Sequence, residues 1–175
     1  MEKVYLGVGS NMKPVFQVER ALLLLKKSVK VAGSSTFYWT SALGHPEQDP
    51  FLNGCWKIET ELSLLDLKEG VLERIEEDLG RRRTEDKWAD RPIDLDILLW
   101  GDRVEECEAW TLPHPDIRNR PFVAIPLLEL DPDLRMPDTG ERLASLEAAL
   151  ESEGMVPAEP VISRLKEMVI EEEHR

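Results

Sequence analysis

Asp94 and Asp96 are the residues whose type and spacing point most directly to chemistry. They lie two positions apart in RPIDLDILLW, residues 91–100, which predicts a β-strand because apolar and β-branched residues dominate it. Side chains two positions apart on a strand point to the same face, roughly 6.6 Å apart along the strand. Two neighbouring carboxylates are costly to bury without a compensating cation. The pair therefore indicates either a solvated strand end or a metal site.

Carboxylate oxygens at this spacing suit Mg²⁺, which keeps several waters and shares oxygen ligands with substrate phosphates. Two such ions usually lie about 3.5–4 Å apart, a gap that neighbouring carboxylates can serve. Arginine and lysine side chains that could contact phosphates are concentrated in residues 81–91 and 118–120. An arginine-rich turn in solvent would have the same composition. The two basic segments thus support a phosphate site only in combination with the aspartates.

The sequence lacks a glycine-rich loop of the kind that cradles phosphate groups. The segment GVGSNMK, residues 7–13, has neither the Gly-Lys-Ser/Thr ending of a Walker A motif nor the third glycine of a dinucleotide fingerprint. We therefore expect side chains and metal ions to hold any phosphate. Gly7 and Gly9 indicate close backbone packing at the end of a strand.

The elements that must position these residues follow a β-α-β-β-α-β order, with Ser10 and Asn11 as candidate caps of the first helix. This order predicts an α+β fold with a ferredoxin-like core, an antiparallel sheet with helices on one face. An extra hairpin strand should reach Trp110, and C-terminal helices should follow at residues 122–130 and 141–150. The core strands are expected at residues 3–9, 34–41, 51–62 and 91–100, and the core helices at residues 15–25 and 64–79.

Composition narrows the class of protein. We expect a single domain over residues 1–160 and a frayed acidic tail over residues 161–175. A net charge of −13 argues against nonspecific binding to nucleic acid. No apolar run approaches the length of about 20 residues that a membrane span needs, and the N-terminus does not resemble a signal peptide. We therefore predict a cytoplasmic monomer without membrane or nucleic-acid partners.

Several motifs, in the same order, resemble the 6-hydroxymethyl-7,8-dihydropterin pyrophosphokinase family. The longest is GRRRTEDKWADRPIDLDILLWGD, residues 80–102, which carries an arginine loop, a tryptophan and Asp-Leu-Asp in a strand. GSN, SSTFYWTSALG and FLNG match in the first part of the chain, and LPHPDIRNRPFVAIPLLELDPDL matches later. The resemblance covers about residues 3 to 138.

The resemblance implies transfer of the terminal two phosphates of ATP to the hydroxymethyl group of a reduced pterin, with release of AMP. It implies two Mg²⁺ ions bound by Asp94 and Asp96, and catalytic roles for Arg81 and Arg91. The residues implied in ATP binding are Glu76, Arg83, Trp88, Thr111, His114 and Arg120. The residues implied in pterin binding are Thr40, Leu43, Phe51, Asn53 and Phe122.

The chain departs from this family at several positions. Ala89 and Asp90 stand where Gly-Pro is common, and Ser41 and Ala42 stand where prolines are common. We expect Arg91 to stabilise charge on the migrating phosphates and Asp90 to have no such role, so that Asp90→Pro would be nearly neutral or mildly helpful. Two other functions remain open from the residues alone: a two-metal phosphodiesterase or nuclease, and a catalytically silent ferredoxin-like binding module. Taken singly, Phe51 and Phe122 could be core residues, and His114 could be a structural loop residue.

Overall fold

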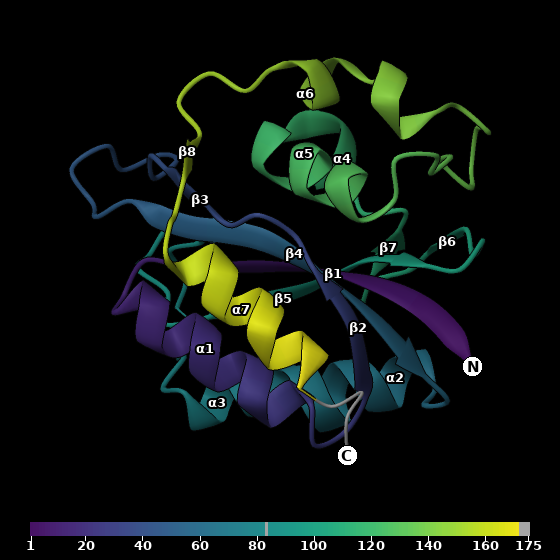
Figure 1. Cartoon of the computed structure of the whole chain (residues 1–175). Helices are drawn as coiled ribbons and strands as arrows, with labels where there is room; N and C mark the ends of the chain where they lie inside the picture. The colour runs from purple at the N-terminus through teal and green to yellow at the C-terminus, as the bar shows by residue number, and fades with distance from the viewer. Residues whose placement is uncertain (83, 172–175) are drawn as a thin grey trace.

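An antiparallel sheet carries the two aspartates in the computed structural model, which describes residues 1–82 and 84–171 (Figure 1). β1 (Glu2–Ser10) pairs with β4 (Phe51–Thr60) on one side and with β5 (Asp94–Trp100) on the other. The strand order is β5-β1-β4-β3-β8, with β2 also paired to β4, and every pairing is antiparallel. The remaining strands are β2 (Lys30–Ser34), β3 (Tyr38–Thr40) and β8 (Val156–Pro157).

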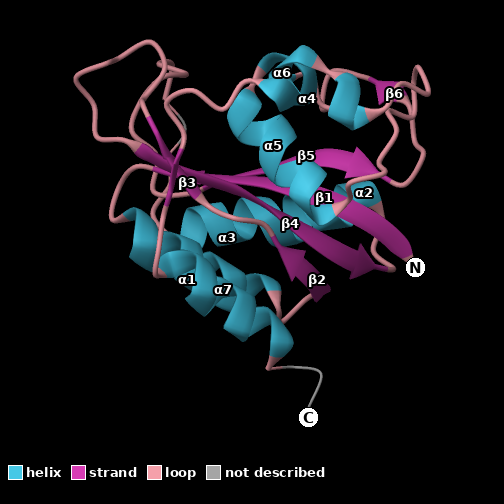
Figure 2. Ribbon diagram, turned by 45° about the horizontal axis from the view of Figure 1, so that its top comes forward, coloured by secondary structure: helices cyan, strands magenta, loops and turns pink. Residues whose placement is uncertain are grey.

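Helices cover both faces of the sheet, not one face as the sequence predicted (Figure 2). One layer contains α1 (Pro14–Leu25), α2 (Leu64–Leu67), the π-helical turn η1 (Lys68–Leu72), α3 (Glu73–Asp78) and α7 (Val161–Ile170). The opposite layer contains α4 (Asp116–Asn119), α5 (Pro121–Leu130), the 3₁₀ turn η2 (Leu143–Ser145) and α6 (Glu147–Leu150). The second layer is needed because the central strands bear apolar side chains on both faces.

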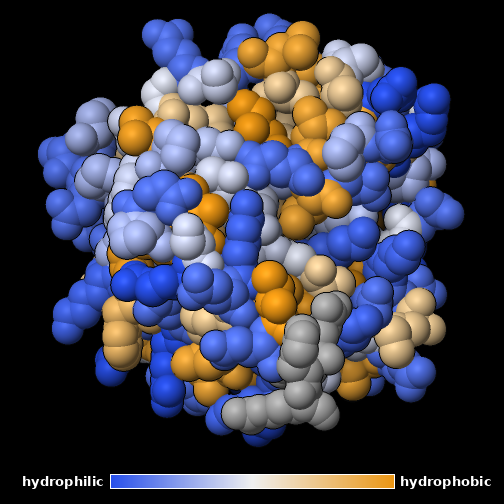
Figure 3. Space-filling model, in the orientation of Figure 1, coloured by the Kyte–Doolittle hydropathy of each residue, from blue (hydrophilic) through white to orange (hydrophobic). Residues whose placement is uncertain are grey.

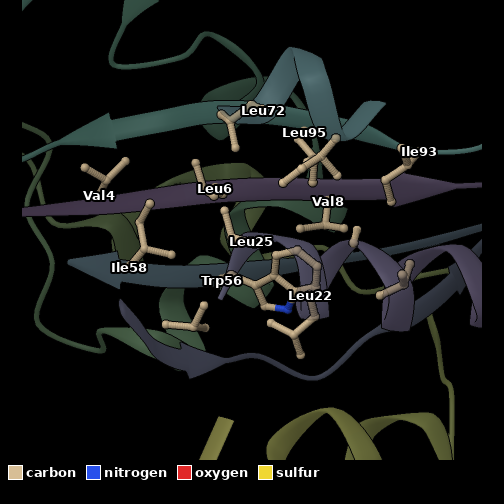
Figure 4. Close-up of a cluster of buried hydrophobic side chains, with 14 of the residues drawn as sticks. Val4, Leu6, Val8, Leu22, Leu25, Trp56, Ile58, Leu72, Ile93 and Leu95 are labelled. Atoms are coloured by element: carbon tan, nitrogen blue, oxygen red, sulfur yellow. The ribbon is translucent and has the colours of Figure 1, made fainter. Parts of the chain in front are cut away.

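The larger core lies between the sheet and the layer that contains α1 and α3. Val4, Leu6 and Val8 alternate along β1 and point into this core together with the fully buried Trp56 of β4 (Figure 4). Tyr5, between them in sequence, belongs instead to the core under α5. This alternation fixes the register of β1, since a shift of one residue would exchange the two faces.

The segment after β5 differs from the predicted edge strand. β6 (Glu105–Glu106) and β7 (Thr111–Leu112) pair with each other in a separate two-stranded ribbon and do not extend the main sheet.

The predicted cap of the first helix is also wrong. Lys13, in the left-handed conformation with φ 47°, precedes Pro14 at the start of α1, and its side chain makes no capping bond.

The C-terminal segment is ordered where we expected a frayed tail. Residues Val161–Ile170 form α7, which lies beside α1 (Figure 1). Val161, Ile162 and Leu165 are buried in the larger core, and this burial explains why the segment is helical although an acidic run follows it at residues 171–173. Residues 172–175 lie outside the described part of the chain.

The outer surface is largely polar. On the face drawn in Figure 3, hydrophilic residues separate the apolar ones, and apolar side chains gather mainly over the layer of α5 and α6. In residues 1–82 and 84–171 no helix combines the length and the apolar character that crossing a bilayer requires.

We predict that Leu165→Ala lowers the free energy of unfolding by about 2–5 kcal/mol, because Leu165 is fully buried between α7 and the sheet. Ile170→Ala, on the same helix but 55% exposed, should change it by no more than about 0.5 kcal/mol. Urea denaturation measures both. Equal small losses would show that α7 frays in solution.

Candidate active site between two cavities

The register of β1 and β5 opens space in front of the two aspartates. Asp94 lies opposite Gly9, and Asp96 lies opposite Gly7. Opposed residues of an antiparallel pair place their side chains on the same face. Since both partners are glycines, no side chain of β1 fills the space beside either carboxylate. A Cβ atom at Gly9 would lie 2.7 Å from Asn53 Oδ1, and one at Gly7 would lie 3.3 Å from the Leu98 side chain, so the glycines allow the close packing that was predicted. Both glycines also line a cavity.

A cavity of about 320 Å³ lies on one side of the aspartates. Phe122 from the start of α5 and Trp88 from the loop before β5 contribute to its walls. The structure thus brings together the whole set that the resemblance assigned to the pterin: Thr40, Leu43, Phe51, Asn53 and Phe122.

A second cavity, of about 520 Å³, lies on the other side. It contains three of the residues predicted to bind ATP, Glu76, Thr111 and His114, and also Arg81, which was predicted to be catalytic. Trp88 and Arg120, also predicted at ATP, line the first cavity instead. Arg83 lies outside the described residues. Both cavities share a wall made by Lys87, Ala89, Arg91, Asp94 and Asp96.

Asp94 is held by two arginines. Arg81 Nη1 donates to Asp94 Oδ1 over 2.6 Å and to Glu76 Oε1 over 2.6 Å. Arg91 Nη1 donates to Asp94 Oδ2, and Arg91 Nη2 donates to the carbonyl of Lys87. The two guanidinium groups balance a cluster of acids at the shared wall. Both would be near any phosphate group placed over Asp94.

Glu76 connects this cluster to the backbone of β5. It is buried on α3, and its Oε1 accepts the Leu95 N–H over 2.8 Å in addition to the bond from Arg81. Burial raises the pKa of Glu76 to about 7, and the Asp94 charge adds to the increase, whereas the Leu95 N–H and Arg81 oppose it. The resemblance assigned Glu76 to ATP, and the structure places it as a support for Arg81 within the second cavity.

Among the described residues, Asp96 forms no ion pair, in contrast to Asp94, which pairs with two arginines. Water reaches its side chain from the cavities, but surrounding protein atoms reduce its hydration, and this burial raises its pKa above the usual range. The charges of Asp94 and Glu76 raise that pKa further, against the opposing effect of Arg81 and Arg91. A cation at Asp96 would relieve this repulsion, so its environment suits a divalent ion.

The described carboxylates supply only part of a metal site, and water or substrate oxygens must supply the other ligands. Among the described side chains, no three His, Cys, Asp or Glu residues come together as a metal site. Two carboxylates leave most positions around an octahedral ion to water or phosphate oxygens, which is how Mg²⁺ binds with nucleotides. The residues present therefore fit a metal that arrives with a phosphorylated ligand.

Two polar side chains that face the cavities are fixed by local bonds. Asn53 Nδ2 donates to Thr40 Oγ1 over 2.8 Å, which sets the orientation of the buried amide in the first cavity. His114 Nδ1 accepts the Asp116 N–H over 3.1 Å, and burial lowers the pKa of the imidazole. A neutral His114 with Nδ1 accepting carries its proton on Nε2, where it can act as a donor.

Two loops that belong to different halves of the sequence meet beside the first cavity. A Cβ atom at Gly44, whose φ is +77°, would lie 3.0 Å from the Trp88 ring, so the glycine permits this contact. His45 Nε2 lies 3.2 Å from Asp86 Oδ2. No local pattern selects His45, because its contact with Asp86 depends on how the two loops fold toward each other.

Comparison with known proteins agrees with this geometry. The family model of 7,8-dihydro-6-hydroxymethylpterin-pyrophosphokinase matches residues 5–132. The chain belongs to this family. A 2-amino-4-hydroxy-6-hydroxymethyldihydropteridine pyrophosphokinase of Haemophilus influenzae is 40% identical over 142 residues, which are 79% of this chain and 88% of that protein. The protein of the same name from Pseudomonas aeruginosa is 37% identical over 158 residues, covering 89% of this chain and 96% of that one.

A solved structure of the family has a similar fold. The crystal structure of Plasmodium falciparum HPPK-DHPS superposes with a TM-score of 0.67 at 14% identity and covers 89% of this chain. The present chain spans only 47% of that chain. The likeness confirms the α+β fold that was predicted from the order of elements.

We predict that Glu76→Ala in this pyrophosphokinase-family chain lowers the free energy of unfolding by about 1–3 kcal/mol, because it leaves the Leu95 N–H and Arg81 without their acceptor. Glu77→Ala, at the next position of the same helix but exposed, is the matched control. Glu76→Gln, which keeps an acceptor oxygen, should lie between them. Chemical denaturation at pH 8 measures the series, and an equal effect of both alanine variants would contradict the supporting role.

Proposed function

We propose that this chain transfers the terminal two phosphates of ATP to the hydroxymethyl group of 6-hydroxymethyl-7,8-dihydropterin and releases AMP, as a step of folate synthesis. One observation carries the proposal: Asp94, Asp96 and Arg91 line both cavities. A donor in one cavity and an acceptor in the other would meet at these three side chains. Family membership agrees with the two substrates.

The first cavity suits a flat heterocycle. Phe51 and Phe122 are available for stacking, an interaction that adds to the burial of apolar area. The amide of Asn53 offers donor and acceptor groups to the edge of a ring. The bond to Thr40 holds this amide in place before the ligand binds. Thr40 and Leu43 complete the proposed pterin site through their backbone groups.

The second cavity is proposed to hold the nucleotide, with its phosphates extended toward the shared wall. Thr111 and His114 would contact ATP there, and Arg81 and Arg91 would bind the migrating phosphates. Trp88 and Arg120, together with Arg83, are retained as ATP residues from the resemblance. Arg120 would reach the phosphates from the side of the first cavity, because those groups must lie between the cavities during transfer.

Asp94 and Asp96 are proposed to hold two Mg²⁺ ions that arrive with ATP. When bound, these ions neutralise phosphate charge and orient the phosphate oxygens. In the transfer itself, the hydroxymethyl oxygen bonds to the β-phosphorus as the bond from that phosphorus to the α,β-bridging oxygen breaks. The protein contributes mainly position and charge: it aligns the two substrates, and Arg81 and Arg91 exchange contacts with Asp94 for contacts with phosphate.

Four finer expectations remain predictions. We propose a ferredoxin-like description of the core, which the order β5-β1-β4 followed by β2 and β3 supports. We also propose that residues 1–160 form a single domain, on which α7 packs, that the protein is a monomer, and that it acts in the cytoplasm.

The proposed reaction is tested by incubating the protein with ATP, Mg²⁺ and 6-hydroxymethyl-7,8-dihydropterin and measuring AMP. We expect AMP and the pyrophosphorylated pterin in equal amounts, and no AMP when the pterin is omitted. AMP or other nucleotide products formed without pterin would favour a phosphodiesterase. Binding of both ligands without any product would favour a catalytically silent module.

We predict that Asp96→Ala reduces turnover below detection while the protein stays folded, because it removes a proposed metal ligand and no apolar packing. The far-UV circular dichroism spectrum and the unfolding midpoint provide the structural check. Asp102→Ala, an exposed aspartate just beyond β5, is the matched control and should keep full activity. Near-normal turnover of Asp96→Ala at millimolar Mg²⁺ would contradict the metal assignment.

Phe122→Ala should weaken pterin binding far more than ATP binding. Stacking of a base on an aromatic ring is worth about 1–3 kcal/mol in nucleic-acid complexes, which corresponds to a loss of affinity of about 5- to 150-fold. Isothermal calorimetry with each ligand separates the two affinities, and Phe16→Ala, a 62% exposed position on α1, controls for loss of a surface ring. Equal losses for both ligands would indicate general damage to the site instead of a lost stacking partner.

A further inference from the structure

Asn11 lies at the end of β1, and its polar groups are directed at the residues that precede β5. Its backbone N–H donates to the carbonyl of Arg91 over 3.1 Å, and its Oδ1 accepts the Arg91 N–H over 2.7 Å. Its Nδ2 donates to Asp90 Oδ1 over 2.6 Å. Asn11 is only 3% exposed, so these bonds are sheltered from water. The side chain expected to cap a helix instead binds a loop 80 residues away.

Ser10 strengthens the same attachment. It is fully buried, and its hydroxyl donates to the carbonyl of Pro92. Together Ser10 and Asn11 hold three consecutive residues, Asp90 to Pro92, against the end of β1. Residues 82 and 84–88, like Asp90, are otherwise exposed. The attachment therefore marks the point at which a solvent-exposed loop becomes fixed to the sheet.

The backbone of Arg91 is fixed in position because Asn11 binds both its N–H and its carbonyl group. Its guanidinium reaches Asp94 and the carbonyl of Lys87. Asp94 in turn pairs with Gly9, two positions before Asn11. The last residues of β1 thus fix the backbone of the arginine and of the aspartate that it contacts. The guanidinium group of an arginine is at the end of a long flexible side chain. It takes up one defined position only if the backbone of the residue is held in this way.

We infer that Asn11 is a positioning residue for Arg91 at the wall between the two cavities, and that Asp90 orients the Asn11 amide for this task. This inference rests on the proposed function for its kinetic consequence, although the attachment itself does not. It also revises the expectation that Asp90 has no role. The carboxylate of Asp90 is an acceptor for Asn11, so Asp90→Pro would remove a bond that the sequence alone did not reveal.

The kinetic test uses Arg91→Ala as its reference. Arg91→Ala should lower kcat by about tenfold or more, with a smaller change in ATP affinity, because Arg91 is proposed to act mainly on the migrating phosphates. Asn11→Ala should lower kcat by about tenfold with a change in the KM for ATP below about threefold. In the Arg91→Ala background, Asn11→Ala should cause no further loss, since residues that act as a unit are not additive.

Variants of Asp90 distinguish its hydrogen bond to the Asn11 amide from the effect of its negative charge. Asp90→Ala should lower kcat by a few fold, whereas Asp90→Asn should restore it to near the parent value, because its Oδ1 still accepts from Asn11. Glu85→Ala removes an exposed acid of the same loop and should leave turnover unchanged. An undiminished effect of Asn11→Ala in the Arg91→Ala background would overturn the inference, as would equal losses for Asp90→Asn and Asp90→Ala.

A measurement that needs no turnover keeps the inference testable by itself. Amide hydrogen exchange of Arg91 should be slow in the parent protein, because Asn11 Oδ1 accepts that N–H, and it should rise by about tenfold or more in Asn11→Ala. Asp90→Asn should preserve the protection, and thermal unfolding shows whether each variant is folded. Fast exchange of the Arg91 amide in the folded parent would contradict the attachment, whether or not AMP is formed. Slow exchange in a parent that forms no AMP would instead refute the proposed function alone.

Discussion

The antiparallel pairing of β1 with β5 is the constraint on which the site depends. Its register places Gly9 and Gly7 opposite Asp94 and Asp96, so that no side chain of β1 stands beside either carboxylate. The same strand continues into Ser10 and Asn11, which attach the segment before β5. Apolar residues that alternate along β1 stabilise this register by packing in the larger core on one face of the sheet. The packing of the core and the geometry of the site therefore have the same origin.

Electrostatics explain why the shared wall is suited to a phosphate and its metal ion. Glu76, Asp94 and Asp96 lie close together, and burial raises the pKa of Glu76 to about 7 and that of Asp96 above its usual range. Arg81 and Arg91 compensate part of this charge through Asp94. A metal–nucleotide complex supplies both the cation that the carboxylates lack and the anion that the arginines can bind. Before any ligand binds, the ion pairs of Arg81 and Arg91 with Asp94 thus hold both the arginines and the carboxylate in position.

Local sequence signals identified much of this arrangement, and long-range contacts account for what they missed. Asp94 and Asp96 were recognisable because period-two spacing on a strand is a local property, and the motifs led to a pterin set that does line one cavity. The second helical layer was missed because the order of the first six elements does not specify what covers the other face of the sheet. The role of Asn11 was missed because an asparagine before a helix also fits a cap, and only the tertiary fold distinguishes these uses. The burial of α7 was obscured by the acidic run at residues 171–173 that follows it.

The central claim is that Asp94 and Asp96 bind metal ions at the wall between the two proposed substrate cavities. The most direct measurement is anomalous diffraction from Mn²⁺ in crystals grown with a non-hydrolysable ATP analogue and 6-hydroxymethyl-7,8-dihydropterin. The account predicts Mn²⁺ ligated by Asp94 and Asp96, with the nucleotide phosphates and the pterin hydroxymethyl group on opposite sides of the metal site. Metal bound away from this pair, or both ligands in one cavity, would contradict it.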